Sequence, residues 1–264
     1  EWRNSLARGL VTTEKGDQIG EDSSYSAGLT VFYTREVPFE PAPTETETIL
    51  FQDEELLVAD KPHGMSVTPA GSHIARSLLN RLQEATGIDS LVPLHRLDRD
   101  TAGLVLFGIN ASSRARYHAL FSTGSIMREY LALANVDETP NQTVWLIKNR
   151  LQGGTPWFRQ EIVAGQVNAI TLIEFITVKD GLGLFRLRPE TGKKHQLRVH
   201  MASLGFPVLG DSLYSGAPHT SNSPALQLLA HRLEFVDPLT GVQRTFRSAR
   251  QLHKDAGFLF HEAG

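Results

Sequence analysis

The chain has 264 residues, 41% of them hydrophobic, so it is long enough to bury a sizeable core in one large domain, with or without an appendage. Its 26 basic and 29 acidic side chains give a formal net charge of −3, which excludes a globally basic coat for nucleic acid but allows a local basic groove. The sequence contains no cysteine, which excludes disulfides, thiolate metal sites and a cysteine nucleophile. It has no apolar run of about eighteen residues and no apolar signal core near its start, so we expect neither a membrane span nor a secretory leader.

Residues 1–45 are predicted to be an N-terminal extension. Pro38, Pro41 and Pro43 forbid a continuous helix or a central strand and indicate a linker. Before this linker, only residues 29–33 have the pattern of a short strand.

The acidic side chains are unevenly distributed. Residues 36–60 contain eight acidic residues and no basic one, so the other 239 residues hold all 26 basic side chains and only 21 acidic ones. The chain outside residues 36–60 is therefore net basic, although the whole chain is net acidic.

Residues 46–264 show the pattern of a compact mixed domain. Apolar runs and alternating patterns predict strands at 48–51, 55–60, 103–109, 126–134, 146–151, 167–178, 182–189, 226–236 and 243–246. Apolar residues at helical spacing or helix-favouring composition predict helices at 73–87, 112–121 and 195–205. Strands outnumber helices and do not alternate with them regularly, so we expect an α+β fold rather than a doubly wound sheet.

Three common catalytic motifs are absent. Lys194 stands where a phosphate-binding loop has Ser or Thr, and Leu187 stands where it has its first glycine. His195 and His200 are five residues apart and lack the HExxH spacing of a zinc protease. There is no GxSxG segment for a serine hydrolase. We therefore expect no metal site.

Two segments concentrate charge beside apolar residues. The first precedes a predicted buried strand and contains His95, Arg96, Asp98, Arg99 and Asp100. One interpretation is that its aspartates cap a turn and pair with the arginines in solvent. The other is that a carboxylate is held at the edge of a cavity.

The second charged segment, residues 186–200, has five Lys or Arg and two His against one Glu. His195 and Arg198 are three residues apart and fall on one face of the predicted helix. The segment is either a solvated basic face, or the source of an arginine for a buried carboxylate and of contacts to phosphates.

Four segments, in order, resemble the motifs of the RluA-type pseudouridine synthases. Residues 95–107, HRLDRDTAGLVLF, are similar to HRLDxxTSGLLL, and residues 190–214, ETGKKHQLRVHMASLGFPVLGDSLY, to (T)GRxHQIRVHLAxxGxPxxGDxxYG. Residues 56–67, LLVADKPHGMSV, resemble VxKPxGLxV, and residues 127–133, MREYLAL, resemble a K/R-x-Y-x-A strand. The HRLD and HQxRVH forms favour this branch over the RsuA type. Ala102 replaces the usual Ser and Lys193 the usual Arg, which preserves size class or charge.

The resemblance implies a pseudouridine synthase fold, with a mixed, largely antiparallel β-sheet core and helices and loops around a central cleft. Residues 46–264 would be the catalytic domain, and residues 1–45 an extension that is not a recognisable S4 RNA-binding module. The implied activity is isomerisation of a uridine to pseudouridine in structured RNA, either ribosomal RNA or tRNA. We expect a cytoplasmic monomer that needs no cofactor, metal, membrane or protein partner.

The resemblance also assigns site residues. Asp98 matches the catalytic aspartate, Arg198 the arginine that pairs with it, and Tyr130 a tyrosine that stacks on uracil and could help to remove the C5 proton. Leu197 is expected to form an apolar wall. The residues expected to bind substrate RNA are Arg96, Arg99, Lys193, Lys194 and His195, together with Lys61.

Alternatives remain open at this stage. The Asp98 carboxylate could add to the ribose C1′, add to the uracil C6, or stabilise positive charge on the sugar. The chain could also be a catalytically inactive RNA-binding relative. A third alternative is a carboxylate-dependent RNA glycosidase or nuclease that uses Asp98 with Asp100.

Overall fold

The computed structural model describes residues 2–34, 45–69, 75–216, 220 and 223–252. The described helices are α1 (Trp2–Ala7), α2 (Leu78–Thr86), α3 (Arg114–Ser122) and α4 (Gln196–Ser203). The described strands are β1 (Val11–Thr13), β2 (Val31–Tyr33), β3 (Thr48–Gln52), β4 (Leu56–Lys61), β5 (Val92–Pro93), β6 (Ala102–Gly108), β7 (Ile126–Asn135), β8 (Val144–Gly153), β9 (Gln160–Val163), β10 (Ala169–Lys179), β11 (Leu182–Pro189), β12 (Leu228–Val236) and β13 (Gln243–Arg247).

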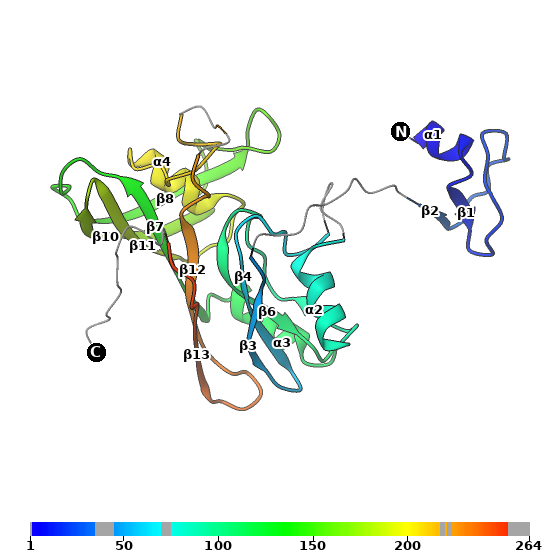
Figure 1. The fold of residues 1–264 in the computed structure, drawn as a ribbon, viewed down its shortest axis with the longest axis horizontal. Helices are drawn as coiled ribbons and strands as arrows, with labels where there is room; N and C mark the ends of the chain where they lie inside the picture. Colours follow the sequence, from blue (N-terminus) through cyan, green and yellow to red (C-terminus); the bar gives the residue numbers. More distant parts are fainter. Residues whose placement is uncertain (1, 35–44, 70–74, 217–219, 221–222, 253–264) are drawn as a thin grey trace.

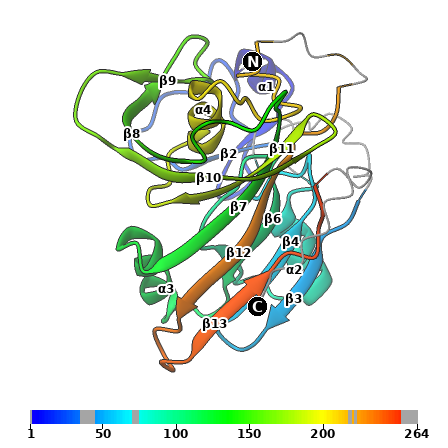
Figure 2. The same ribbon diagram turned by 90° about the vertical axis from the view of Figure 1, so that its left-hand side faces the viewer.

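One large sheet organises the fold. Its strands follow the order β3-β4-β6-β12-β7-β11-β10-β8-β9, with β13 paired to β12 and β5 to β6. The β12–β6 pairing is parallel, and the other pairings described in this sheet are antiparallel. Figure 2 shows β12 between β7 and β6, at the centre of the molecule. The predicted α+β class with a mixed, largely antiparallel sheet is therefore confirmed.

The continuous apolar runs of β4 and β6 reflect burial on both faces. In β4, Leu57 packs in a cluster with Leu78 and Leu82 of α2, while its neighbour in sequence, Leu56, packs with Tyr117 of α3. Because successive strand residues point to opposite faces of the sheet, this one strand packs against both helices. Figure 1 shows α2 and α3 beside this part of the sheet.

Helix α4 covers another part of the sheet. Its Leu197 and Met201 belong to the same apolar cluster as Phe185 and Leu187 of β11. In Figure 1, α4 lies beside β8 and β11. The loops that precede β6 and α4 meet at a common cavity, where Asp98 Oδ2 and His195 Nε2 are 3.9 Å apart, and β6, β12 and β7 are neighbours in the sheet.

Gly103 permits the parallel contact at this centre. It pairs with Ala230 of β12 and has φ +111°, a conformation that favours glycine. A Cβ atom at this position would lie 2.2 Å from the Ala230 carbonyl oxygen. Any side chain here would push β12 away from β6.

The predicted strands of residues 46–252 are all present, with ends shifted by a few residues. The largest shift among the helices is that of 73–87, which begins only at Leu78. Ser77 caps this helix by accepting a hydrogen bond from the Asn80 N–H, and Gly87 ends it with φ +69°. The unpredicted β5 and β9 have two and four residues, too few for a periodic pattern.

The N-terminal residues form a small unit of their own. The predicted strand at 29–33 is confirmed as β2, which pairs with β1. The proposed linker prolines, Pro38, Pro41 and Pro43, lie outside the described residues. Within the described residues, no helix is long and apolar enough to cross a membrane.

Candidate active site

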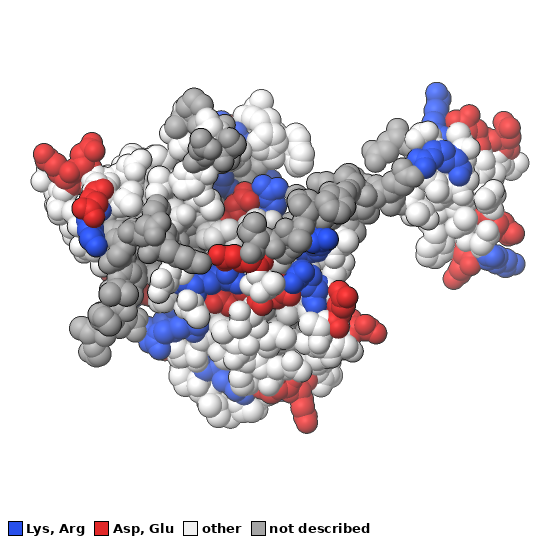
Figure 3. Space-filling view, viewed as in Figure 1, with Lys and Arg blue, Asp and Glu red and all other residues white. Residues whose placement is uncertain are grey.

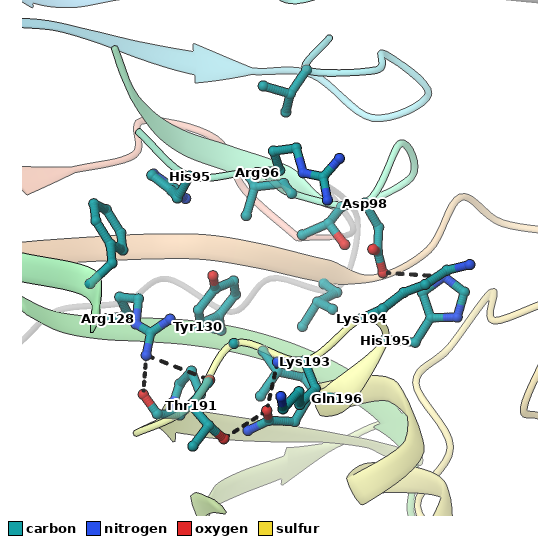
Figure 4. Close-up of a pocket in the computed structure, with 18 of the residues that line it drawn as sticks. His95, Arg96, Asp98, Arg128, Tyr130, Thr191, Lys193, Lys194, His195 and Gln196 are labelled. Atoms are coloured by element: carbon teal, nitrogen blue, oxygen red, sulfur yellow. Dashed lines mark hydrogen bonds and ion pairs between the residues drawn. The ribbon is translucent and has the colours of Figure 1, made fainter. Parts of the chain in front are cut away.

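A cavity of about 760 Å³ opens at the centre of the sheet, within the size range of small-molecule sites. It is lined by the loop before β6, strand β7, the loop between β11 and α4, and α4 itself (Figure 4), and also by residues of α3, of β12 and of the segment after β4. Of the ten predicted site residues, nine line it: Arg96, Asp98, Arg99, Tyr130, Lys193, Lys194, His195, Leu197 and Arg198. Segments far apart in the sequence therefore meet at one site.

Asp98 lies in a turn that leads into β6. Its carbonyl oxygen accepts a hydrogen bond from the Thr101 N–H at 3.1 Å, and its side chain is 27% exposed. The Oδ2 atom is 3.5 Å from Arg198 Nη1 and 3.9 Å from His195 Nε2. Figure 4 shows Asp98 turned toward His195. The expected pairing of Asp98 with Arg198 is thus present in the structure.

Arg198 has a second and closer partner, Asp211, which sequence reasoning missed. Its Nε and Nη2 each donate to an Asp211 carboxylate oxygen at 2.7 Å, which leaves Nη1 for Asp98. Burial by itself would lower the pKa of Arg198, but the bonds to Asp211 and the charges of Asp211 and Asp98 outweigh it and raise this pKa. Arg198 is therefore a fixed cation.

Asp211 is itself held by the backbone around it. Its Oδ1 accepts hydrogen bonds from the N–H groups of Leu213 at 2.8 Å and Tyr214 at 3.0 Å. The preceding Gly210 has φ +78°, and a Cβ there would lie 2.4 Å from the Ala225 carbonyl oxygen. The Gly-Asp pair in the matching segment 190–214 was the available signal for this carboxylate.

His195 connects Asp98 to a tyrosine. It is the residue before α4, with φ +54°, and its Nδ1 is 2.8 Å from the Tyr214 hydroxyl. That hydroxyl accepts a hydrogen bond from the Gln160 N–H at 2.8 Å, so its own proton is available for Nδ1. This arrangement leaves the imidazole proton on Nε2, facing Asp98. Burial lowers the pKa of His195, and the nearby Arg198 adds to this effect although Asp98 opposes it.

Lys61 corrects one prediction. It was expected to bind RNA, but it is fully buried and does not line the cavity. Its ammonium donates to the carbonyl oxygens of Pro62 at 3.0 Å, Met65 at 2.8 Å and Arg99 at 2.9 Å. Burial lowers its pKa to about 7, although Asp100 and Asp98 act in the opposite direction. Lys61 therefore ties the segment 56–67 to the loop that carries Asp98.

Tyr130 lies on β7 and is almost fully buried in the cavity wall. Burial raises the pKa of its phenol; the Arg128 charge lowers this pKa and the Asp98 charge raises it. The phenol is therefore protonated near neutral pH. Leu197 adds the expected apolar surface to the same cavity.

Arg128, two residues before Tyr130, is a cavity residue that was given no role. Its Nη2 donates to the carbonyl oxygens of Pro189 and Glu190, both at 3.1 Å (Figure 4). It thereby holds the start of the loop between β11 and α4. His95 also lines the cavity, and its Nε2 accepts a hydrogen bond from the Leu106 N–H at 3.1 Å. Burial, with the Arg128 charge second, lowers the pKa of His95 to about 3.

Gln196 fixes the other end of that loop. Its Oε1 accepts hydrogen bonds from the Thr191 hydroxyl at 2.8 Å and the Lys193 N–H at 3.0 Å. Its Nε2 donates to the Ile170 carbonyl oxygen at 3.0 Å and to the Thr171 hydroxyl at 2.8 Å. The basic loop is therefore anchored to β10.

The predicted RNA-contacting cations stand around the cavity. Figure 3 shows basic and acidic side chains interleaved in a band across the middle of the molecule. Arg99 lies at the cavity and pairs with Asp100 through Nε and Oδ1 at 2.9 Å. Asp100 does not line the cavity; its carboxylate pairs with Arg99 instead.

The arrangement offers one partly exposed carboxylate, a fixed guanidinium beside it, a protonated tyrosine and an apolar wall. Such a carboxylate can act as a nucleophile or stabilise positive charge, and the guanidinium keeps it oriented. In the part of the chain that the structure describes, no three His, Asp or Glu side chains are grouped as a metal site.

Comparisons with known proteins agree with this geometry. The sequence model of the family described as RNA pseudouridylate synthase matches residues 55–203. Ribosomal large subunit pseudouridine synthase D of Zymomonas mobilis subsp. mobilis is 30% identical, over 98% of this chain and 87% of its own length. tRNA pseudouridine synthase C of Vibrio vulnificus is also 30% identical, over 76% of this chain and 89% of its own length.

The solved structure of human RNA Pseudouridylate Synthase Domain Containing 1 is similar in fold. It is 21% identical, has a TM-score of 0.65, and the similarity covers 80% of this chain and 86% of that one. Human RNA Pseudouridylate Synthase Domain Containing 4 is 25% identical with a TM-score of 0.59, over 78% of this chain and 88% of that one.

Proposed function

Because the chain belongs to the RNA pseudouridylate synthase family, and so is an isomerase that acts on RNA, we propose that Asp98 is its catalytic aspartate. The observation that carries this proposal is the position of the Asp98 carboxylate, which faces the central cavity and lies 3.5 Å from Arg198 Nη1. Residues 46–264 form the catalytic domain in this proposal.

The reaction breaks the N1–C1′ bond of a uridine, rotates the base and forms a C5–C1′ bond. A proton leaves C5 and N1 gains one, so no oxidant, reductant or cofactor is required. Asp98 adds to C1′ or C6, or stabilises positive charge on the sugar. Arg198 keeps the carboxylate oriented, because its guanidinium is a fixed cation 3.5 Å away.

Tyr130 packs against the uracil ring in this proposal. A phenol that stays protonated near neutral pH is a poor base, so its raised pKa favours stacking over removal of the C5 proton. Leu197 closes the pocket from α4.

The substrate is a uridine in structured RNA. To reach an enclosed pocket this nucleotide must leave its stack, at a cost of about a few kcal/mol. The cations around the cavity supply contacts to the phosphates: Arg96, Arg99, Lys193 and Lys194. Ribosomal RNA is the first class of substrate to test, because the relative that aligns over 98% of this chain is named a ribosomal large subunit pseudouridine synthase. Transfer RNA is the second, because another relative is named a tRNA pseudouridine synthase. We expect a monomer that acts in the cytoplasm.

The test is release of tritium from RNA transcripts labelled at C5 of uridine. Wild-type protein should release tritium from ribosomal RNA or tRNA without cleaving the strand. The Asp98→Asn variant should be inactive while its far-UV circular dichroism and melting temperature stay close to those of the wild type. Normal release by this variant would overturn the assignment. Strand cleavage would instead indicate a nuclease, and binding without release an inactive relative.

A further inference from the structure

An exposed aromatic residue stands beside the catalytic cavity, in the loop between β8 and β9. Trp157 is 82% exposed, although tryptophan is usually covered because of its large apolar surface. The loop has a defined backbone, since the Gly154 N–H donates to the Arg159 carbonyl oxygen at 3.1 Å and the Arg159 N–H to that of Pro156 at 2.9 Å. Trp157 is thus held out into solvent by an ordered turn.

This loop is attached directly to the candidate active site. At its end, the Gln160 N–H donates to the Tyr214 hydroxyl, which in turn contacts His195 beside Asp98. In addition, Lys194 Nζ lies 5.7 Å from the centroid of the Trp157 ring, and Lys194 lines the catalytic cavity. Trp157 therefore stands next to the route by which RNA would reach Asp98.

The chemistry around Trp157 fits an unpaired nucleotide. An open aromatic face can stack on any base, and a neighbouring cation can meet the phosphate of the same nucleotide. Lys194 supplies one such cation, and Arg159, two residues along the loop, supplies a second close to the Tyr214 ring. An apolar protein surface would gain nothing from these charges, so charge complementarity favours RNA as the occupant.

We propose that Trp157 is a stacking platform for an unpaired base that neighbours the target uridine. This inference rests on the proposed function and adds a substrate contact to it. When the target uridine enters the cavity, the adjacent base loses a stacking partner, and the indole ring replaces it. The platform would favour uridines in loops and bulges over those in continuous duplex, because only an unpaired neighbour can reach the ring.

The test measures RNA affinity without relying on turnover. The probe is a fluorescein-labelled oligouridylate of about twelve nucleotides, a length that spans typical single-strand sites, and the readout is anisotropy at fixed salt. Trp157→Ala should bind it about five- to a hundredfold more weakly, and Trp157→Phe within about threefold of the wild type. The matched control is Tyr25→Ala, another exposed aromatic residue, at 92%, which should leave affinity unchanged.

Salt dependence separates stacking from charge. Trp157→Ala should keep the wild-type slope of log affinity against log salt, whereas Lys194→Ala should reduce it by about 0.7. Unchanged oligouridylate affinity of Trp157→Ala would overturn the proposal and leave the exposed ring to a protein contact. The proposal would also be overturned if Trp157→Ala lost the same factor of affinity for a blunt-ended RNA duplex as for the oligouridylate.

The same variants distinguish this proposal from the catalytic one. If wild-type protein released no tritium from any RNA, the proposed function would fail, while the stacking contact would still be read from the binding curves. If tritium release is normal and Trp157→Ala has unchanged KM and affinity, only the stacking contact fails.

Discussion

The contact between Arg198 and Asp211 offers the sharpest test of how the site is built. The change is Asp211→Asn, which keeps the shape of the side chain but removes its charge. Asp211 is fully buried, Arg198 nearly so, and their two bonds are both 2.7 Å long. Asparagine has a single acceptor oxygen, and its amide group would face a guanidinium donor. The variant thus leaves a buried cation half-paired.

The magnitude follows from burial. Breaking one side of a buried, hydrogen-bonded ion pair costs about 3–5 kcal/mol, and Asp211→Asn retains one acceptor, so we expect a loss of about 2–4 kcal/mol in the free energy of unfolding. We also expect kcat to fall by about a hundredfold, because Arg198 would turn toward Asp98 and misplace the carboxylate. Urea unfolding and tritium release measure the two effects.

The matched control is Asp100→Asn, in the exposed pair with Arg99. Surface pairs contribute about 0–1 kcal/mol, so this variant should be nearly as stable as the wild type. If Asp211→Asn and Asp100→Asn had equal stability and equal kcat, the inference that Asp211 orients Arg198 would be wrong.

Two further predictions concern the framework of the site. The pKa of Lys61 is lowered in the folded protein, so the unfolded chain binds more protons than the folded one between about pH 7 and pH 10. This residue should therefore make the free energy of unfolding rise with pH in that window, by up to about 1.4 kcal/mol per pH unit. Urea unfolding of Lys61→Met across the same range should show a flatter slope, and parallel slopes would contradict the assignment. Gly103→Ala should lose more than about 2 kcal/mol in the same assay, because the new Cβ would lie 2.2 Å from the Ala230 carbonyl oxygen; Gly64→Ala, where φ is also positive but nothing lies within 4 Å, is the control.

Much of the secondary structure could be predicted because it depends on local patterns of apolar and polar residues. The strands at 55–60 and 103–109 are built on apolar runs, 56–59 in the first, and the structure buries both faces of β4 and β6. Helix α2 shows a feature that the local apolar pattern did not predict, namely the residue at which the helix begins. The apolar spacing extends from Ile74, but Ser77 caps the helix, and the periodicity alone did not identify that cap.

The site could be predicted to a similar extent. The motif residues Asp98, Tyr130 and Arg198 were identified from sequence, and the structure brings them to one cavity. Asp211 lay inside a recognised motif but received no role, because no local pattern tells which cation a carboxylate will meet. Lys61 was assigned to the RNA-binding group because it lies in one of the matching motifs, and only the fold shows that its side chain is buried.

The sequence by itself determined the class of fold, the family resemblance and the residue types that carry the chemistry, since these depend on short-range periodicity and on spacing within motifs. Only the tertiary structure decided which groups meet: Asp211 with Arg198, Tyr214 with His195, and Lys61 with the loop of Asp98. The residues in these contacts are 13, 19 and 38 positions apart, beyond the reach of helical or strand periodicity. Their geometry depends on how β12 packs against β6 and how α4 packs on β11, which no local stretch of sequence encodes.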